Sequence, residues 1–277
     1  MILPPRHKFN AAFSWRKRPE RNLRVLDAQS IADFNTRGYT VIREAVSQHQ
    51  VQELLPVIDA MEAGEDETVL TLDGGGAVTF GTDQMTFACN LAARDARLRA
   101  FASSAIMRDL MHDLIGPDVR LYWDQAVYKK PRHVAGFAWH QDNGYTYVEP
   151  QDYITCWLAL TDADASNGCP WVLPGLHQNG TFAHDQGNEG LVIAGLDPDS
   201  IAERAVCTPA KAGDMVIFSS LTPHMTGPNL TDKTRKSYIL QYIPDGTERV
   251  HDDGHREDLC DPQYHFQVLE NGKAVPE

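Results

Sequence analysis

Several kinds of segment are missing from this chain of 277 residues. No apolar run approaches the ~18–20 residues that a membrane-spanning helix needs, so we expect no membrane partner. The first residues also lack the apolar stretch of a secretory signal. The five cysteines show no paired spacing, and an odd, scattered set indicates reduced thiols in a cytoplasmic protein rather than a disulfide framework; they are Cys89, Cys156, Cys169, Cys207 and Cys260.

Basic residues are scarce as well. The chain has 25 Lys and Arg against 38 Asp and Glu, which gives a net charge of −13. Residues 1–24 hold seven of the basic residues and one acid, so the rest of the chain carries 18 basic and 37 acidic residues, a net charge of −19. Nucleic-acid binding depends on a basic surface, and we therefore expect no nucleic-acid partner.

The basic residues near the start form an N-terminal arm, residues 1–26. An Arg-rich, acid-poor composition is typical of organelle-targeting segments, which is one interpretation. The other is a solvated arm that lies on the acidic surface of the remaining chain. We favour the second, because Pro4 and Pro5 oppose an amphipathic helix at the start.

Residues 27–118 carry the signals of helices. Asp27 and Ser47 are suitable helix caps, and Ser47 forms a capping box with Gln50. The expected elements are a helix from Asp27 to about Thr36 that ends at Gly38, a helix after Ser47, a helical stretch from Arg94 to Ile115, and a turn at Gly74-Gly75-Gly76.

From about Val119 the pattern changes to short runs of strand-forming residues separated by Pro, Gly, Asn and Asp. The expected strands cover 119–129, 137–141, 153–160, 169–173, 190–193, 204–208, 214–218, 223–226 and 236–243. Many short strands with turn signals predict a barrel or sandwich. We therefore expect one mainly β domain over 27–277, in which a helical part (27–118) supports a jelly-roll core (119–245) with a C-terminal extension (246–277).

The strongest chemical signal is the segment Trp139-His140-Gln141-Asp142-Asn143. On a strand, residues i and i+2 project to the same face, so His140 and Asp142 would point together into the core. His224 follows a predicted buried strand and is the best candidate for a third ligand. Two histidines and one carboxylate leave three positions open on an octahedral metal, which is the arrangement of non-haem Fe(II) oxygenases. A His-x-Asp pair by itself is also common as an ordinary surface pair.

Arg235 makes the interpretation of the His-x-Asp pair as part of an oxygenase site more specific. It lies eleven residues after His224, near the start of the next predicted strand. Inside a barrel, a guanidinium there can bind a carboxylate through two parallel hydrogen bonds. The alternative is a surface arginine that pairs with Asp232.

Taken together, these segments resemble the phytanoyl-CoA dioxygenase family of Fe(II)- and 2-oxoglutarate-dependent oxygenases. The resembling stretches are Gly38–Ile42, Trp139–Asn143, Trp157–Leu160, Asn167–His177 and His224–Arg235, with Leu176 where the family usually has Ser. The resemblance implies a double-stranded β-helix, a cupin-like jelly roll, in which iron is bound by His140, Asp142 and His224. It also implies that Arg235 binds the distal carboxylate of 2-oxoglutarate.

Three further roles follow from the resemblance. Thr226 would offer a hydroxyl to the same carboxylate, and Trp157 would line the co-substrate pocket. Gln125 matches a strand that often directs a polar group to 2-oxoglutarate, although a slip of one residue would place Asp124 or Ala126 there instead.

The other histidines are weaker candidates. We expect His177 to fix its loop rather than bind metal, and His251 and His255 to lie in a solvated loop. His184 follows Gly180–Ala183 in a loop that can reach the barrel mouth, so a substrate contact is open. A pocket role is also open for three aromatic residues, with plain packing as the alternative; these are Trp123, Tyr145 and Tyr147.

The reaction that the resemblance implies consumes O2 and 2-oxoglutarate, releases succinate and CO2, and usually hydroxylates an unactivated C–H bond. Asp142 favours hydroxylation over halogenation, because its carboxylate occupies the position that a halide would take. Desaturation, epoxidation and cyclisation stay open. One rival is a Zn or Mn jelly-roll lyase, isomerase or hydrolase, which would not need Arg235 and Thr226; another is a non-enzymatic small-molecule-binding barrel.

Charge bears on the substrate. The loops expected at the barrel mouth hold Glu149, Asp152, Asp185 and Glu189, with no Lys or Arg between His133 and Asp199. We therefore expect a small metabolite rather than an acyl-coenzyme A thioester, whose phosphates call for basic side chains. The stretch Arg16-Lys17-Arg18 would supply the missing charge only if the arm folds back.

Overall fold

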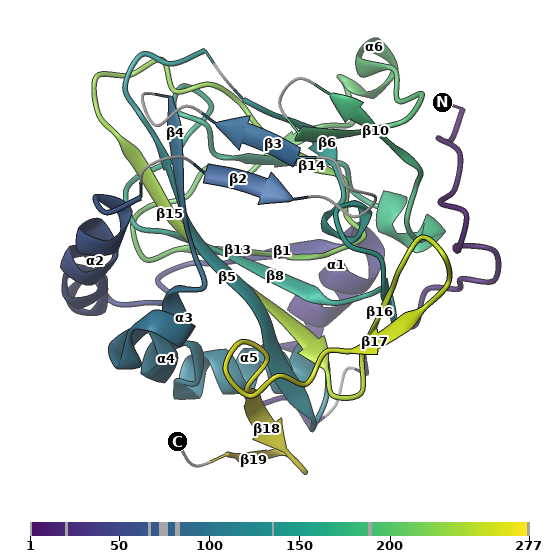
Figure 1. Ribbon diagram of the computed structural model, residues 1–277, viewed down its shortest axis with the longest axis horizontal. Helices are drawn as coiled ribbons and strands as arrows, with labels where there is room; N and C mark the ends of the chain where they lie inside the picture. Colours follow the sequence, from purple (N-terminus) through teal and green to yellow (C-terminus); the bar gives the residue numbers. More distant parts are fainter. Residues whose placement is uncertain are drawn as a thin grey trace.

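The computed structural model describes residues 2–19, 22–65, 68–71, 77–80, 84–134, 136–187 and 190–275. Within these residues, a large antiparallel sheet has helices packed on one face and a smaller sheet opposite its other face (Figure 1). No helix in this part of the chain is both long and apolar enough to cross a bilayer.

The large sheet has eight strands, and β4 and β18 pair with opposite ends of the long strand β5. In order across the sheet, the strands are β1 (Tyr39–Ile42), β13 (Met215–Ser219), β8 (Ile154–Ala159), β15 (Arg235–Pro244), β5 (Val119–Lys129), β18 (Gln267–Glu270) and β19 (Lys273–Ala274), with β4 (Met85–Cys89) beside β5.

The smaller sheet carries the segments with the strongest chemical signals. Its order is β12 (Val206–Cys207), β9 (Pro170–Val172), β14 (His224–Thr226) and β6 (Phe137–His140). The remaining strands form a hairpin of β2 (Thr68–Thr71) with β3 (Ala77–Phe80), a hairpin of β10 (His184–Gly187) with β11 (Gly190–Ile193), and a three-stranded sheet of β17 (Arg256–Asp258), β16 (Glu248–Val250) and β7 (Val148–Glu149).

Side-chain alternation divides the two faces of the large sheet. On β8, Ile154, Cys156 and Leu158 belong to the apolar cluster that includes the helices. Trp157 and Ala159 belong to a second cluster, which the large sheet shares with β9 of the smaller sheet. The period of two along each strand therefore gives one face to the helical support and the other to the space between the sheets.

The helices confirm the predicted caps but not every predicted length. Asp27 caps α1 (Ala28–Arg37), which ends at Gly38 with φ 82°, and Ser47 forms the expected capping box of α2 (Gln48–Glu62). The helical stretch expected over 94–115 is three helices: α3 (Leu91–Arg94), α4 (Ala96–Ala102) and α5 (Ala105–Leu114). Asp95 adopts an extended conformation and caps α4, which interrupts the stretch. The turn predicted at Gly74–Gly76 lies outside the described residues.

The mainly β, jelly-roll fold class predicted from the sequence is confirmed. All nine predicted strands are present with shifts of at most two residues at each end; for example, β5 covers 119–129 as expected. Several short strands were not predicted, including β1, β4 and those after residue 245. The chain also contains α6 (Pro198–Ile201) and two short 3-10 helices, η1 (Asp142–Gly144) and η2 (Leu176–Asn179).

The N-terminal arm lies on the body of the protein. Lys8 forms an ion pair of 2.7 Å with Asp252, and Arg18 pairs with Asp152. Asn10 is buried and donates hydrogen bonds to the carbonyls of Asn179 and Thr181. These contacts agree with an arm held on an acidic surface, although Asn10 is more deeply buried than a solvated arm would require.

A buried carboxylate fixes the end of the arm, just before α1. Asp113, in the last turn of α5, accepts hydrogen bonds of 2.9–3.0 Å from the backbone N–H groups of Arg24, Val25 and Leu26. Its side chain is fully buried. One carboxylate thus satisfies three amides that would otherwise have no partner.

We expect Asp113→Ala to lower the free energy of unfolding by about 3 kcal/mol, because it leaves these amides without an acceptor. The matched control is Asp109→Ala, which removes a more exposed pair with Arg24 and should cost less than about 1 kcal/mol. Equilibrium urea unfolding measures both values. Equal losses in the two variants would contradict the anchoring role of Asp113.

Candidate metal centre

Two histidines face each other across the smaller sheet. His140 is the last residue of β6 and His224 is the first residue of β14, and the two are direct partners in the antiparallel register. Direct partners project to the same face of a sheet. Their ring centroids are 4.2 Å apart, and both side chains are more than nine-tenths buried.

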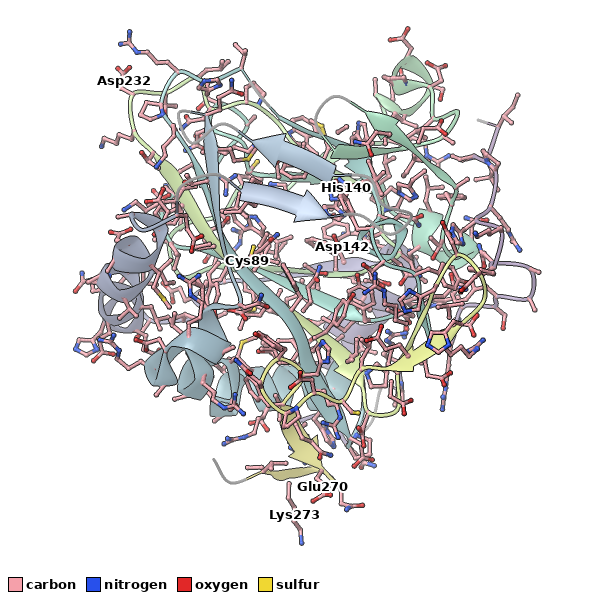
Figure 2. All side chains as sticks on the ribbon, in the orientation of Figure 1. Cys89, His140, Asp142, Asp232, Glu270 and Lys273 are labelled. Carbon is pink, nitrogen blue, oxygen red and sulfur yellow. The ribbon has the colours of Figure 1, made fainter. Side chains whose placement is uncertain are left out.

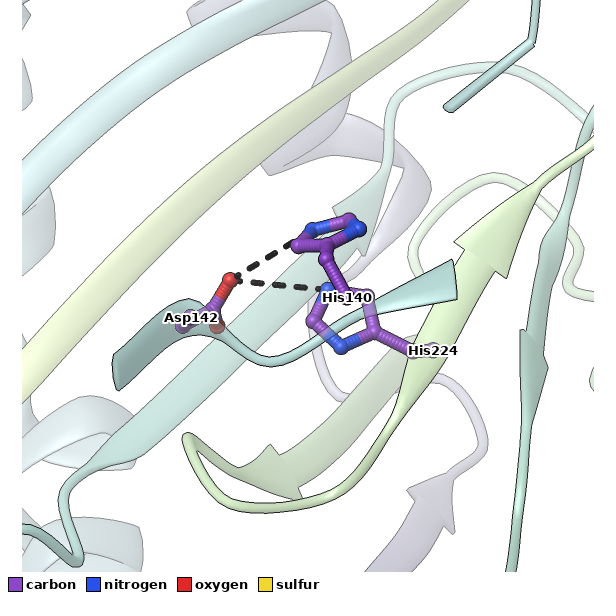
Figure 3. A group of neighbouring side chains, drawn as sticks. All are labelled: His140, Asp142 and His224. Atoms are coloured by element: carbon purple, nitrogen blue, oxygen red, sulfur yellow. Dashed lines mark ion pairs between the residues drawn. The ribbon is translucent and has the colours of Figure 1, made fainter. Parts of the chain in front are cut away.

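Asp142 completes the group, but not from a strand as we expected. Strand β6 ends at His140, and Asp142 is the first residue of η1. Gln141 between them is still extended, with φ −117° and ψ 140°, and this turns Asp142 to the same side as His140. Figure 3 shows the three side chains converging, with Asp142 Oδ1 at 3.9 Å from His140 Nε2 and 3.5 Å from His224 Nε2.

Backbone carbonyls fix the tautomer of both histidines. His140 Nδ1 lies 2.7 Å from the carbonyl oxygen of Ala138, and His224 Nδ1 lies 3.0 Å from that of Thr222. A carbonyl only accepts, so each Nδ1 carries a proton and donates it. The Nε2 atom of each neutral ring therefore presents a lone pair toward Asp142 Oδ1.

Burial sets the charge state of the group. It lowers the pKa of His140 to about 3 and that of His224 to about 4, so both rings are neutral near pH 7. Burial also raises the pKa of the Asp142 carboxyl. Two imidazole lone pairs and a carboxyl group whose ionised form lacks a counter-ion among the described residues, all within 4.8 Å of one another, suit a bound cation.

The group opens into a cavity of about 70 Å³ between the two sheets. All three candidate ligands line it, and so do the four residues expected to contact a co-substrate: Arg235, Thr226, Trp157 and Gln125. The structure thus brings together in one cavity the seven residues predicted to bind the metal or the co-substrate.

Arg235 is buried to 1% exposure, which excludes the surface alternative. Asp232, its suggested partner there, pairs with Arg132 instead. The Nη1 atom of Arg235 donates to Ser237 Oγ at 2.6 Å and to the carbonyl of Val127 at 3.3 Å.

Among the described residues, no carboxylate lies within 4.0 Å of the Arg235 guanidinium, and its buried Nε has no hydrogen-bond partner. The guanidinium centre lies 5.4 Å from the ring of Trp157. Burial lowers the pKa of Arg235 to about 9, so the group still carries a proton near pH 7. A buried cation with a free donor is suited to an anionic ligand.

Gln125 rather than either neighbour faces the cavity. Asp124 and Ala126 point to the helical side, where Asp124 accepts from the Tyr238 hydroxyl at 2.8 Å. The side-chain oxygen of Gln125 accepts from the indole N–H of Trp123 at 3.2 Å. The slip of one residue that would move Gln125 off this face does not occur.

Sequence reasoning missed two polar residues of the cavity. The Thr155 hydroxyl donates to Asp142 Oδ2 at 2.5 Å, and Gln241 Nε2 donates to the Thr155 oxygen at 3.3 Å. Thr and Gln are ordinary residues on strands, and neither stands in a recognisable motif. The periodicity of their strands could have placed both on the inner face.

Gln141 and His184 support the ligand segment from outside the cavity lining. The amide of Gln141 donates to the carbonyls of Gly180 and Leu221. His184 Nε2 accepts from the backbone N–H of Gln141 at 3.0 Å. In this structure His184 therefore holds the segment between His140 and Asp142, and the contact with substrate that we considered stays a prediction.

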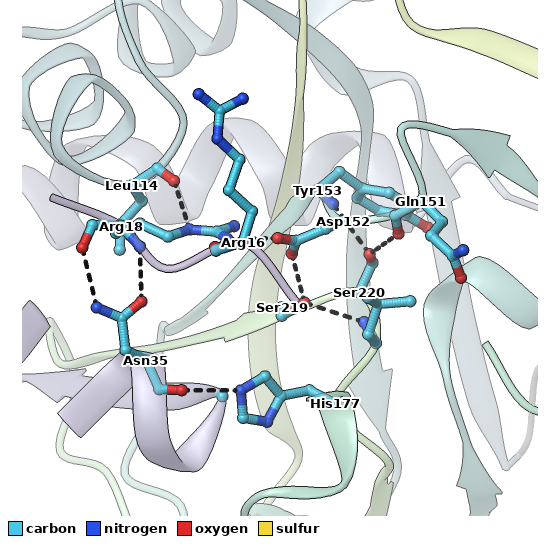
Figure 4. A network of polar contacts seen from close by, with 12 residues as sticks. Arg16, Arg18, Asn35, Leu114, Gln151, Asp152, Tyr153, His177, Ser219 and Ser220 are labelled. Atoms are coloured by element: carbon cyan, nitrogen blue, oxygen red, sulfur yellow. Dashed lines mark hydrogen bonds and ion pairs between the residues drawn. The ribbon is translucent and has the colours of Figure 1, made fainter. Parts of the chain in front are cut away.

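Two other histidine expectations agree with the geometry. His177 is fully buried in η2 and bonds the carbonyl of Asn35, as a residue that fixes its loop would (Figure 4). His251 pairs with Glu257 at 3.0 Å, and neither His251 nor His255 belongs to the metal-binding group found among the described residues.

The chain is similar to several known proteins. A family model described as phytanoyl-CoA dioxygenase (PhyH) matches residues 34–237. A phytanoyl-CoA dioxygenase of Arabidopsis thaliana is 30% identical over 118 residues, 42% of this chain and 42% of that protein, so the match spans less than half of that relative. A methylphosphonate hydroxylase of Gimesia maris is 28% identical over 222 residues, 80% of this chain and 82% of the relative.

Solved structures share the fold. The non-haem alpha-ketoglutarate-dependent carbocyclase SnoK from nogalamycin biosynthesis has a TM-score of 0.74 at 20% identity and covers 88% of this chain and 97% of its own. EctD from S. alaskensis, solved with 2-oxoglutarate and 5-hydroxyectoine, has a TM-score of 0.62 at 20% identity and covers 92% and 85%.

We expect His140→Ala, Asp142→Ala and His224→Ala each to weaken binding of Co(II), a stable substitute for Fe(II), by more than the 10- to 100-fold that loss of an outer-sphere partner typically costs. Isothermal titration of the purified proteins measures the affinity. His251→Ala, at a partly exposed histidine, is the control and should bind as the original does. If any of the three variants binds Co(II) with unchanged affinity, the residue that it replaces is not a metal ligand.

Proposed function

The chain belongs to the phytanoyl-CoA dioxygenase family, and on this basis we propose that it is an Fe(II)- and 2-oxoglutarate-dependent dioxygenase that hydroxylates an unactivated C–H bond of a small molecule. Succinate and CO2 are the other products. The observation that supports this most directly is one cavity that holds both the His140–Asp142–His224 group and the unpaired, buried Arg235.

The residues present fit the two ligands that the proposal needs. Two neutral imidazoles and one carboxylate are the donor set of non-haem Fe(II) sites and leave three coordination positions for other ligands. Arg235 has a free Nε donor beside its Nη groups, so a carboxylate can accept from both. When bound, iron and 2-oxoglutarate would activate O2, which supplies the oxidising power of the reaction.

The protein's own side chains bind, orient and exclude water. Arg235 holds the distal carboxylate of 2-oxoglutarate, and the hydroxyl of Thr226 and the amide of Gln125 offer polar contacts in the same cavity. Trp157 forms one wall. The rest of the lining is largely apolar and keeps water away from the reacting centre; it includes Phe87, Val127, Phe137, Phe218 and Ile239.

The proposal also specifies the outcome of the reaction, which is hydroxylation. Asp142 occupies the coordination position that a halide would need, which supports hydroxylation over halogenation. Proteins of similar structure include an epimerase and a carbocyclase, so this fold also carries other outcomes. A Zn or Mn jelly-roll enzyme would show no dependence of oxygen consumption on 2-oxoglutarate, and a binding protein would consume no oxygen.

We expect Arg235→Leu to weaken binding of 2-oxoglutarate by roughly a hundredfold or more, because a charge-assisted bidentate contact in a buried site is lost. Calorimetric titration of 2-oxoglutarate into the Co(II)-loaded protein measures this, and affinity for Co(II) itself should change little. Arg132→Leu, at an exposed arginine, is the control. Unchanged affinity for 2-oxoglutarate in Arg235→Leu would show that Arg235 does not bind this co-substrate.

The distribution of charge supports a substrate without phosphate groups. Residues 44–93 and 134–199, which include β2 to β4 and the loops around β6 to β11, contain no Lys or Arg. Apart from the candidate ligands, Arg235 is the one charged side chain in the cavity lining as described. If Arg235 binds 2-oxoglutarate, no cation is left there for a phosphate or a phosphonate.

Part of the acidic rim expected from the sequence is neutralised. Asp152 pairs with Arg18 and Glu149 pairs with Arg256 at 2.5 Å, while Glu189 lies outside the described residues. The arm therefore folds back onto the body of the protein, which is the condition under which its basic stretch could supply positive charge to the site. Arg16 and Lys17, however, line a different cleft, beneath the arm, that shares no residue with the metal cavity. A substrate without phosphate groups is therefore supported by the lack of basic side chains, other than the one at Arg235, in the described lining of the metal cavity, and not by repulsion from an acidic rim.

We expect turnover with small uncharged metabolites or free acids but not with acyl-coenzyme A thioesters or methylphosphonate. Succinate released in the presence of each member of such a panel, with 2-oxoglutarate and Fe(II), measures this. More efficient hydroxylation of any thioester than of its free acid would show that the substrate prediction is wrong, while leaving the reaction class intact.

A further inference from the structure

The two oxygens of the Asp142 carboxylate have different surroundings. Oδ1 faces the Nε2 atoms of His140 and His224. Oδ2 is engaged by the hydroxyl of Thr155 at 2.5 Å. The protein therefore distinguishes the oxygen on the metal side from the other one before any ligand binds.

The direction of these hydrogen bonds is fixed by the chemistry of the groups. A carboxylate only accepts, so the single hydroxyl proton of Thr155 is donated to Asp142. The Thr155 oxygen is then left to accept, and Gln241 Nε2 donates to it at 3.3 Å. The result is a short chain that runs from Gln241 through Thr155 to Asp142.

The large sheet places both residues rigidly. Thr155 on β8 and Gln241 on β15 are direct partners in the antiparallel register, so their side chains share a face. That face also carries Trp157 and Ile239, and all four residues line the metal cavity. Thr155 is 2% exposed, so water does not compete for its hydroxyl. Central strands hold a side chain more precisely than the loop of Asp142 does.

We propose that Thr155 is a positioning residue that restricts Asp142 to one metal-binding oxygen, and that Gln241 orients Thr155 for this task. The inference rests on the proposed Fe(II)- and 2-oxoglutarate-dependent function. Two histidines, one carboxylate oxygen and a chelating 2-oxoglutarate use five of six positions on an octahedral metal. A second oxygen from Asp142 would use the sixth position, which O2 requires.

The variant that tests this is Thr155→Val, which keeps the shape of the side chain and removes the hydroxyl. We expect its dissociation constant for Co(II) to rise by about 10-fold or more. The visible absorption of bound Co(II), which reports the number and geometry of its ligands, should also differ from that of the original protein, both before and after 2-oxoglutarate is added. Gln241→Leu should change both properties in the same direction and less.

Two controls separate positioning from a general structural effect. Thr155→Ser keeps the hydroxyl and should restore both the affinity and the spectrum. Thr208→Val removes another buried threonine hydroxyl, one that donates to the carbonyl of Pro170 at 2.7 Å, and should leave Co(II) binding unchanged. Thermal melting of the metal-free proteins checks that each variant folds.

The outcomes distinguish this inference from the function on which it rests. If Thr155→Val binds Co(II) with the original affinity and spectrum, Thr155 does not position Asp142. If Thr155→Ser behaves like Thr155→Val, the effect comes from packing and the inference is again wrong. If the original protein binds neither Co(II) nor 2-oxoglutarate, the proposed function itself fails.

Discussion

Alternation of side chains along β8 and β15, and along the part of β5 that follows its irregularity near Trp123, is the constraint on which the site depends. On β5, β8 and β15, one set of residues packs against the helices and the other set faces the smaller sheet. Arg235, Ile239 and Gln241 share the inner face of β15 because they are separated by even numbers of residues. A shift of one residue in register would send these polar groups into the apolar contact with the helices, so the hydrophobic pattern of the outer face also fixes the chemistry of the inner one.

The charges in the cavity explain why the site suits two ligands of opposite sign. Burial disfavours the ionised form of Asp142 and of Arg235, and no ion pair joins the two among the contacts described. A divalent cation beside Asp142 and a dicarboxylate beside Arg235 would keep the total charge at zero and give each buried charge a partner of opposite sign. With the proposed ligands bound, the free energy of unfolding therefore rises with the logarithm of the ligand concentration.

The sequence was sufficient for features that depend on local patterns and insufficient for those that depend on distant partners. The caps at Asp27 and Ser47 and the strand over 119–129 are local signals, and they were predicted correctly. Asp142 was expected on a strand because spacing alone does not show that β6 ends two residues earlier. Thr155 could not be connected to Gln241, 86 residues away, until the strand register was known. The boundary between arm and domain at residue 26 stays a prediction.

The arm has a consequence for the order in which the chain can fold. The backbone N–H of Ala183 donates to the carbonyl of Pro5, Asn10 bonds to Thr181 across 171 positions in sequence, and Lys8 reaches Asp252 across 244 positions. Asn10 and Lys8 are therefore synthesised well before their partners. Contacts of such long separation form late and slowly, so the segment that covers the turn around Thr181 docks after the sheets beneath it have assembled.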